Sequence, residues 1–163
     1  MKDATPIRSM VTLATIAASL TFLLLAFPFR ASAALGGDES SIQADQNQMK
    51  AAKKTVSTTS NYSVHQLQSE GGATVKEFVS PQGRVFGVTW QGPVMPNLQQ
   101  LLGDYYAQFQ QAAAAGRAAR RRGPVVIQQP GLVVESGGHM RAYTGRAYVP
   151  GMLPEGVQAK EIR

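Results

Sequence analysis

The chain has 163 residues, no cysteine, and 16 basic against 10 acidic side chains, for a net charge of +6 at pH 7. The lack of cysteine excludes disulfides, cysteine zinc ligands and thiol nucleophiles. The four bases Arg117, Arg120, Arg121 and Arg122 lie within six positions, so the positive charge is concentrated in one loop. This pattern differs from the broad basic face of nucleic-acid-binding domains, and we expect no nucleic-acid partner.

Residues 1–33 have the layout of an export signal. Two basic residues precede an apolar run at 10–29, and small residues stand at the −3 and −1 positions of a cleavage site between Ala33 and Ala34. Cleavage there would release residues 34–163 into the periplasm or the medium. The alternative is an uncleaved membrane anchor, because the apolar run approaches the length that spans a bilayer.

The first half of residues 34–163 predicts one helix followed by three strands. Residues 38–56 begin with acidic and end with basic side chains, which suits a helix dipole. A polar linker at 57–61 follows. Gly-Gly and Pro-Gln-Gly steps then separate the strand-like runs 62–69, 74–80 and 84–91, which we interpret as an antiparallel meander.

Alternation in the third run places Phe86, Val88 and Trp90 on one face of the sheet, the core face. Residues 96–115 then form the clearest helix, with apolar side chains at helical spacing. Gly103 lowers helix propensity within this segment by about 1 kcal/mol relative to Ala, which suggests a close approach to another element.

An Arg-rich loop at 116–124 precedes the last strands, expected at 125–127, 132–135 and 140–149, with turns at 130–131 and 137–138; residues 150–163 form an irregular tail. The fold class is therefore α+β: a single small domain over 34–163, with an antiparallel sheet of about five strands and one or two helices on one face, after the signal-peptide helix. The expected core is Phe78, Phe86, Val88, Trp90, Leu98, Leu101, Leu102, Tyr105, Phe109, Val134 and Tyr143.

Candidate catalytic residues are few. His65 and His139 are possible general bases or metal ligands, but neither has an acidic or histidine neighbour at ligand spacing. A two-histidine site requires their strands to pair. Ser136 with His139 is a hydrolase dyad in principle, although the glycine of a nucleophile elbow is missing. We favour structural roles for all three residues, and expect no metal or cofactor.

Two surfaces are candidates for binding. The aromatic, glycine and proline residues of 90–93 and 145–150 are typical of ligand-binding edges as well as of strand ends. The cluster Arg117, Arg120, Arg121 and Arg122 is a possible contact for an anionic partner; the alternative is a solvated loop.

Several blocks of the chain resemble one family of small exported bacterial proteins. These are residues 34–37, 62–65, 85–93, 98–103 and, in the last third, 138–143 with 145–148. They look like the family catalogued as domain of unknown function 2844. The resemblance implies export and a single domain in Gram-negative bacteria, and it brings no activity, cofactor or catalytic residue with it.

Our sequence-based hypothesis is a non-enzymatic binding or accessory protein of the cell envelope. One alternative is a small periplasmic hydrolase using His139 or His65. Another is a binder of anionic surfaces through Arg117–Arg122. The ligand, the partner and the oligomeric state stay open.

Overall fold

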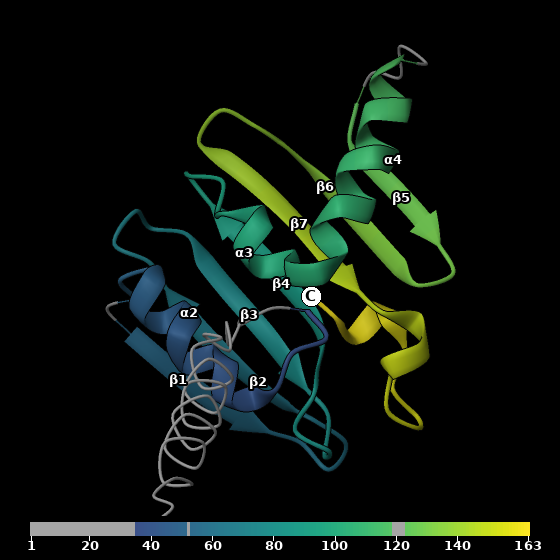
Figure 1. The fold of residues 1–163 in the computed structure, drawn as a ribbon. Helices are drawn as coiled ribbons and strands as arrows, with labels where there is room; N and C mark the ends of the chain where they lie inside the picture. Colours follow the sequence, from purple (N-terminus) through teal and green to yellow (C-terminus); the bar gives the residue numbers. More distant parts are fainter. Residues whose placement is uncertain (1–34, 52, 119–122) are drawn as a thin grey trace, which may run out of the picture. The chain divides into compact units, whose positions relative to one another are not determined.

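A single antiparallel sheet dominates the computed structural model, which describes residues 35–51, 53–118 and 123–163 (Figure 1). The strands within these residues are β1 (Lys53–Thr58), β2 (Ser63–Gln68), β3 (Thr74–Val79), β4 (Val85–Gly92), β5 (Val125–Gln129), β6 (Leu132–His139) and β7 (Ala142–Tyr148). Their order across the sheet is β1-β2-β3-β4-β7-β6-β5, so β4 and β7 join two meanders. The α+β class is confirmed, but the sheet has seven strands in this part of the chain rather than about five. The expected signal helix lies outside the described residues.

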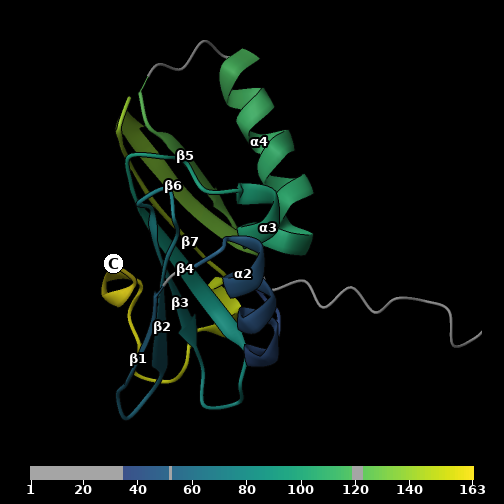
Figure 2. The ribbon, with the colours of Figure 1, turned by 90° about the vertical axis from the view of Figure 1, so that its left-hand side faces the viewer.

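The helices α2 (Ile42–Gln48), α3 (Leu98–Leu102) and α4 (Tyr106–Ala118) lie on one side of the sheet, here named the helix face (Figure 2). Sequence predicted one helix at 96–115, whereas the structure interrupts it with a 3-10 turn, η2 (Gly103–Tyr105). The reason is local: Gly103 has φ of 50° and ψ of −123°, outside helical geometry, and it terminates α3. The expected loop at 116–124 is also too long, because α4 continues to Ala118.

The predicted helix over 38–56 is wrong in its second half. A 3-10 turn, η1 (Glu39–Ser41), leads into α2, and the chain then reverses at Lys50, whose φ is 46°. From Lys53 onward the chain is strand β1, which pairs with β2 in the register Val56 to His65. The apolar stripe of residues 38–56 is too thin to hold a long helix against the core. As a strand, the second half of this segment can instead form backbone hydrogen bonds with β2 along its whole length.

The turn predicted at Gly137 and Gly138 is also wrong. Both glycines lie inside β6, opposite Thr144 and Tyr143 of β7, and the hairpin turns instead at Arg141, whose φ is 67°. The two strands approach closely there, because a Cβ added to Gly138 would lie 2.1 Å from the Ala142 carbonyl oxygen.

The main core fills the space between the sheet and the helix face. Most of the expected core residues are buried, but Tyr143 is half-exposed and belongs to neither apolar cluster. The prediction that Phe86 shares a face with Val88 and Trp90 is wrong. The β3–β4 register shifts between Phe78 and Val79, and this bulge turns Phe86 to the opposite side of the sheet.

That opposite side, here named the tail face, is partly covered by residues 150–163. They form two 3-10 turns, η3 (Pro150–Met152) and η4 (Ala159–Glu161), and lie across the sheet from the helices (Figure 2). Val157 and Ile162 pack on Phe78 and Phe86 in a second apolar cluster. The tail covers only one end of this face, and rows of polar strand side chains on the rest of the face stay uncovered.

Candidate functional site

His65 lies on the helix face of β2 and is only 4% exposed. Its Nε2 is 3.0 Å from Oε1 of Glu39, and burial lowers its pKa, so the ring is neutral at pH 7. This buried position fits a structural role.

A buried pair of acids, which sequence reasoning missed, lies beside His65. Glu77 of β3 pairs across the ladder with His65, and its carboxyl contacts that of Asp45 from α2; both acids are at most 2% exposed. Burial raises the pKa of Glu77 to about 9 and that of Asp45 to about 6. Gln100 donates to Asp45, whereas no protein donor in the described residues reaches Glu77, so Glu77 is the acid of the pair that burial keeps protonated at neutral pH. One feature of the sequence could have indicated a buried acid: Glu77 stands at a core-facing position of β3, between the core residues Val75 and Val79.

Ser136 and His139 are not brought together. They are three residues apart on β6, a separation of about 10 Å, and strand alternation points them to opposite faces. His139 is exposed at the hairpin end, with Nδ1 3.1 Å from the Met140 carbonyl oxygen. His65 and His139 are also apart, because β3, β4 and β7 separate their strands.

The arginine cluster is described only in part. Arg117 lies in the last turn of α4 and is exposed, while Arg120, Arg121 and Arg122 lie outside the described residues. Across residues 35–51, 53–118 and 123–163, no group of three His, Asp or Glu side chains is placed to hold a metal ion. No helix in these ranges is long and apolar enough to cross a membrane.

The two segments that sequence suggested as a ligand surface meet at only one pair of residues, Trp90 of β4 and Gly145 of β7. Because the two strands are antiparallel, residues 91–93 and 146–150 run away from this pair in opposite directions. At the junction of β4 and β7, Gln91 pairs with Thr144 and Thr89 pairs with Arg146. A hollow of about 600 Å³ lies over this junction on the tail face. We name it the β4–β7 trough; polar side chains from four strands and the tail line it, among them Thr74, Lys76, Gln91, Glu135, Thr144, Arg146 and Arg163.

Cations outnumber acids along the trough. Arg146 makes a two-pronged contact with Glu135, through Nε at 3.1 Å and Nη2 at 2.9 Å, and its Nη1 donates to the Ala159 carbonyl. These bonds fix the guanidinium in place, and the hydrogen bonds that it donates to Glu135 raise its pKa. Lys76 donates from Nζ to the Arg163 carbonyl at 3.2 Å. The trough therefore combines hydroxyl and amide groups with a surplus of positive charge.

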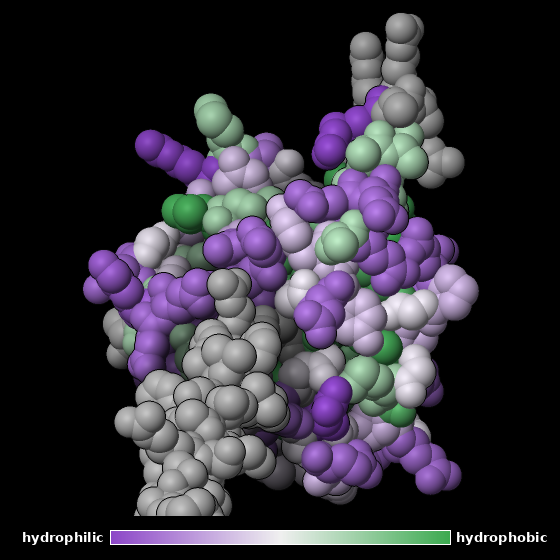
Figure 3. Space-filling view, viewed as in Figure 1, coloured by the Kyte–Doolittle hydropathy of each residue, from purple (hydrophilic) through white to green (hydrophobic). Residues whose placement is uncertain are grey.

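Exposed apolar residues do not form one broad patch on the helix side. In Figure 3 small hydrophobic groups lie scattered among hydrophilic ones. Val94 and Met95, from the loop between β4 and α3, and Met140, from the turn between β6 and β7, are exposed large apolar residues. Single residues of this kind are normal on a folded surface and mark no site.

The fold and the trough are those of a small α+β domain with a polar sheet face. The family described as protein of unknown function, DUF2844, matches residues 31–162, and the chain belongs to this family. No curated protein and no solved structure matches the chain.

Proposed function

We propose that this chain is an exported, non-enzymatic binding protein of the bacterial cell envelope, and that the β4–β7 trough holds its ligand. The observation that carries the proposal is the junction of β4 and β7. Two strands far apart in sequence pair there under one open hollow, and hydrogen-bond donors and acceptors line it alongside the core residues Trp90 and Ile162.

Export is supported by the layout of residues 1–33 and by the position of the first described residues. Leu35, two positions after the expected cleavage site, is 2% exposed, and its N–H donates to the Leu101 carbonyl at 3.0 Å. The family match also begins only at residue 31, after the apolar run. Residues directly after the expected cleavage site thus pack into the described domain.

The lining predicts the class of ligand. Threonine hydroxyls and the Gln91 amide suit a polyhydroxylated molecule, and the surplus of cations favours one that carries a carboxylate or phosphate. An acidic sugar combines both features. The Lys76 ammonium is bound less tightly than the Arg146 guanidinium, because its one hydrogen bond is to a backbone carbonyl.

The test is a titration of isotope-labelled protein with glucuronic acid, glucose 6-phosphate and, as a neutral control, glucose, followed by NMR. The proposal expects amide shifts at Gln91, Thr144 and Arg146 with the acidic sugars and weaker ones with glucose. Lys76→Gln should weaken binding about tenfold, as for loss of one charged hydrogen bond. Lys50→Gln removes an exposed lysine on the other side of the sheet and should leave affinity unchanged. Shifts that avoid the trough with all three probes would overturn the proposal.

A further inference from the structure

Strand β5 forms one edge of the sheet and carries no charge. It pairs only with β6 among the described strands, and its sequence is Val-Val-Ile-Gln-Gln. Val125 and Val126 are 38% and 53% exposed. The other edge, β1, begins with two lysines, the residue that commonly protects an edge strand from pairing with another chain. The two edges of this sheet are therefore chemically different, and β5 is the unprotected one.

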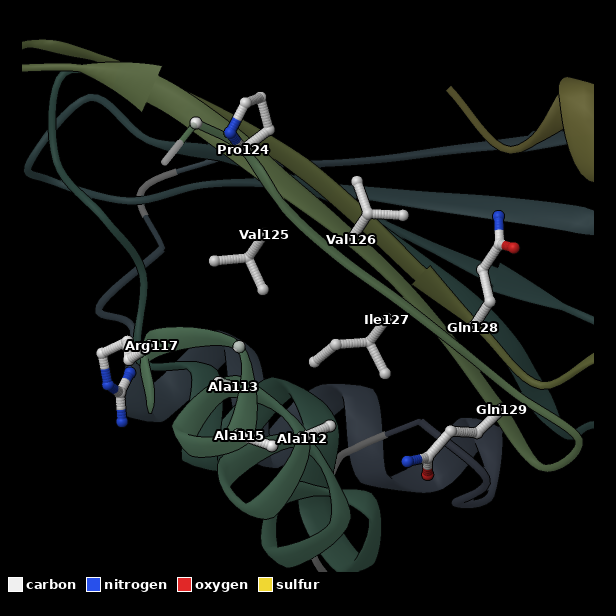
Figure 4. Close-up of a pocket in the computed structure, with 12 residues that line it drawn as sticks. Ala112, Ala113, Ala115, Arg117, Pro124, Val125, Val126, Ile127, Gln128 and Gln129 are labelled. Atoms are coloured by element: carbon white, nitrogen blue, oxygen red, sulfur yellow. The ribbon is translucent and has the colours of Figure 1, made fainter. Parts of the chain in front are cut away.

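A groove runs along the unprotected edge, between β5 and α4. It has a volume of about 410 Å³, and all five residues of β5 line it, as expected when the free backbone edge of the strand forms a wall. The α4 wall is made of small residues, Ala112, Ala113, Ala115 and Gly116. Figure 4 shows Val125 and Ile127 pointing toward α4 and Val126 pointing away from it. The groove thus leaves room beside the edge for side chains of one further strand.

We propose that this further strand is β5 of a second copy of the chain. An antiparallel pair centred on Ile127 places Val126 opposite Gln128 of the second copy, and Val125 opposite its Gln129. No charged side chain faces another in this register, and both valines lose exposure to water. Arg117 lines the groove near Pro124, at the start of β5. In an antiparallel pair the two strand starts lie at opposite ends, so the Arg117 side chains of the two copies are far apart.

The pairing makes one continuous sheet from two chains. A twofold axis that relates two antiparallel strands in a sheet is perpendicular to that sheet, so the two tail faces lie on the same side. Both β4–β7 troughs then open in one direction. This association rests on the β5 edge alone, and it does not depend on what the trough binds.

The first test is the molar mass of the purified protein by light scattering, over a range of concentration and salt. The wild type should form a dimer, and association should strengthen with salt, because two copies of positive net charge repel each other. Val125→Lys with Val126→Lys copies the lysine pair of β1 and should raise the dimer dissociation constant at least tenfold. Val56→Lys, an equally exposed valine on the other edge, is the matched control and should leave the dimer intact.

The second test fixes the register and does not require the dimer to be abolished. Since the chain has no cysteine, Val126→Cys and Gln128→Cys introduce single thiols. A mixture of the two variants should oxidise mainly to the mixed disulfide, because residues 126 and 128 face each other across the pair. A protein that stays monomeric at every concentration would overturn the proposal. So would a dimer weakened by Val56→Lys but not by the β5 lysines, or one whose association weakens steeply with salt, as expected for an anionic bridge.

Discussion

At the scale of single residues, Gly145 shows how the β4–β7 junction is built. It pairs with Trp90, and the indole lies directly over it on the helix face: a Cβ at position 145 would be 2.2 Å from Cζ2 of Trp90 and 2.7 Å from the Glu135 carbonyl oxygen. Neither neighbour is the end of a flexible chain. Position 145 must therefore be a glycine, because only the absence of a side chain leaves room for the buried Trp90 indole to lie across β7.

Gly145→Ala should accordingly lower the free energy of unfolding by about 1–3 kcal/mol, the usual cost of overpacking a core. Gly131→Ala is the matched control, because no atom lies within 4 Å of the added Cβ and its φ is not in the left-handed region. Urea denaturation followed by the fluorescence of Trp90, the only tryptophan, measures both variants. Equal stability of the two variants would contradict the packing described here.

At the scale of elements, the Asp45–Glu77 carboxyl pair attaches α2 to β3. The groups that face it are Gln100 from α3, Lys54 from β1 and His65 from β2. Burial raises the pKa of Glu77 to about 9 from an ordinary value of 4.5, so the folded chain keeps a proton that the unfolded chain has lost at neutral pH. Folding therefore binds a proton, and the free energy of unfolding falls as pH rises toward 9.

The test is the slope of stability against pH between 7 and 8.5, where the neutral ring of His65 contributes little. The wild type should lose stability with rising pH, by at most about 1.4 kcal/mol per pH unit for one proton. Glu77→Gln keeps the shape without the ionisation and should flatten that slope. Glu70→Gln, at an exposed position in the turn between β2 and β3, should retain it. A Glu77→Gln slope as steep as that of the wild type would show that another group binds the proton.

The elements that could be predicted from sequence are those whose signals are local. Residues 62–91 hold turn residues and alternating side chains, and β2, β3 and β4 lie where the pattern indicates. Strand β1 was missed because its ladder partner, not its own composition, makes it a strand. The acid pair was missed for the same reason: Asp45 and Glu77 lie far apart in sequence, and only the docking of α2 joins them. The two segments proposed as a ligand surface share only four residues with the lining of the trough, because the pairing of β4 with β7 is a property of the fold that their composition does not show.

At the scale of the whole molecule, the start of the folded part bears on how the protein is processed. Leu35 is buried, the Gly36 N–H donates to the Val85 carbonyl at 2.8 Å, and the Val85 N–H donates to the Gly37 carbonyl at 2.9 Å. These contacts hold residues 35–37 against β4 and α3. Leader peptidases cleave after small residues in an extended segment, so a site at Ala33 lies immediately beside chain that folding sequesters. Cleavage should therefore precede folding.

The intact mass of the protein from fractionated cells tests this order. The wild type should begin at Ala34 and occur in the periplasmic or culture fraction. Ala33→Leu replaces the small residue at −1 and should leave a full-length chain in the membrane fraction, whereas Ser32→Leu, at the permissive −2 position, should be processed as the wild type is. Purified precursor that is folded before a leader peptidase is added should resist cleavage, and denatured precursor should be cut. A full-length wild-type chain in the membrane fraction would mean instead that residues 10–29 are an anchor, and that the trough faces its ligand from the membrane surface.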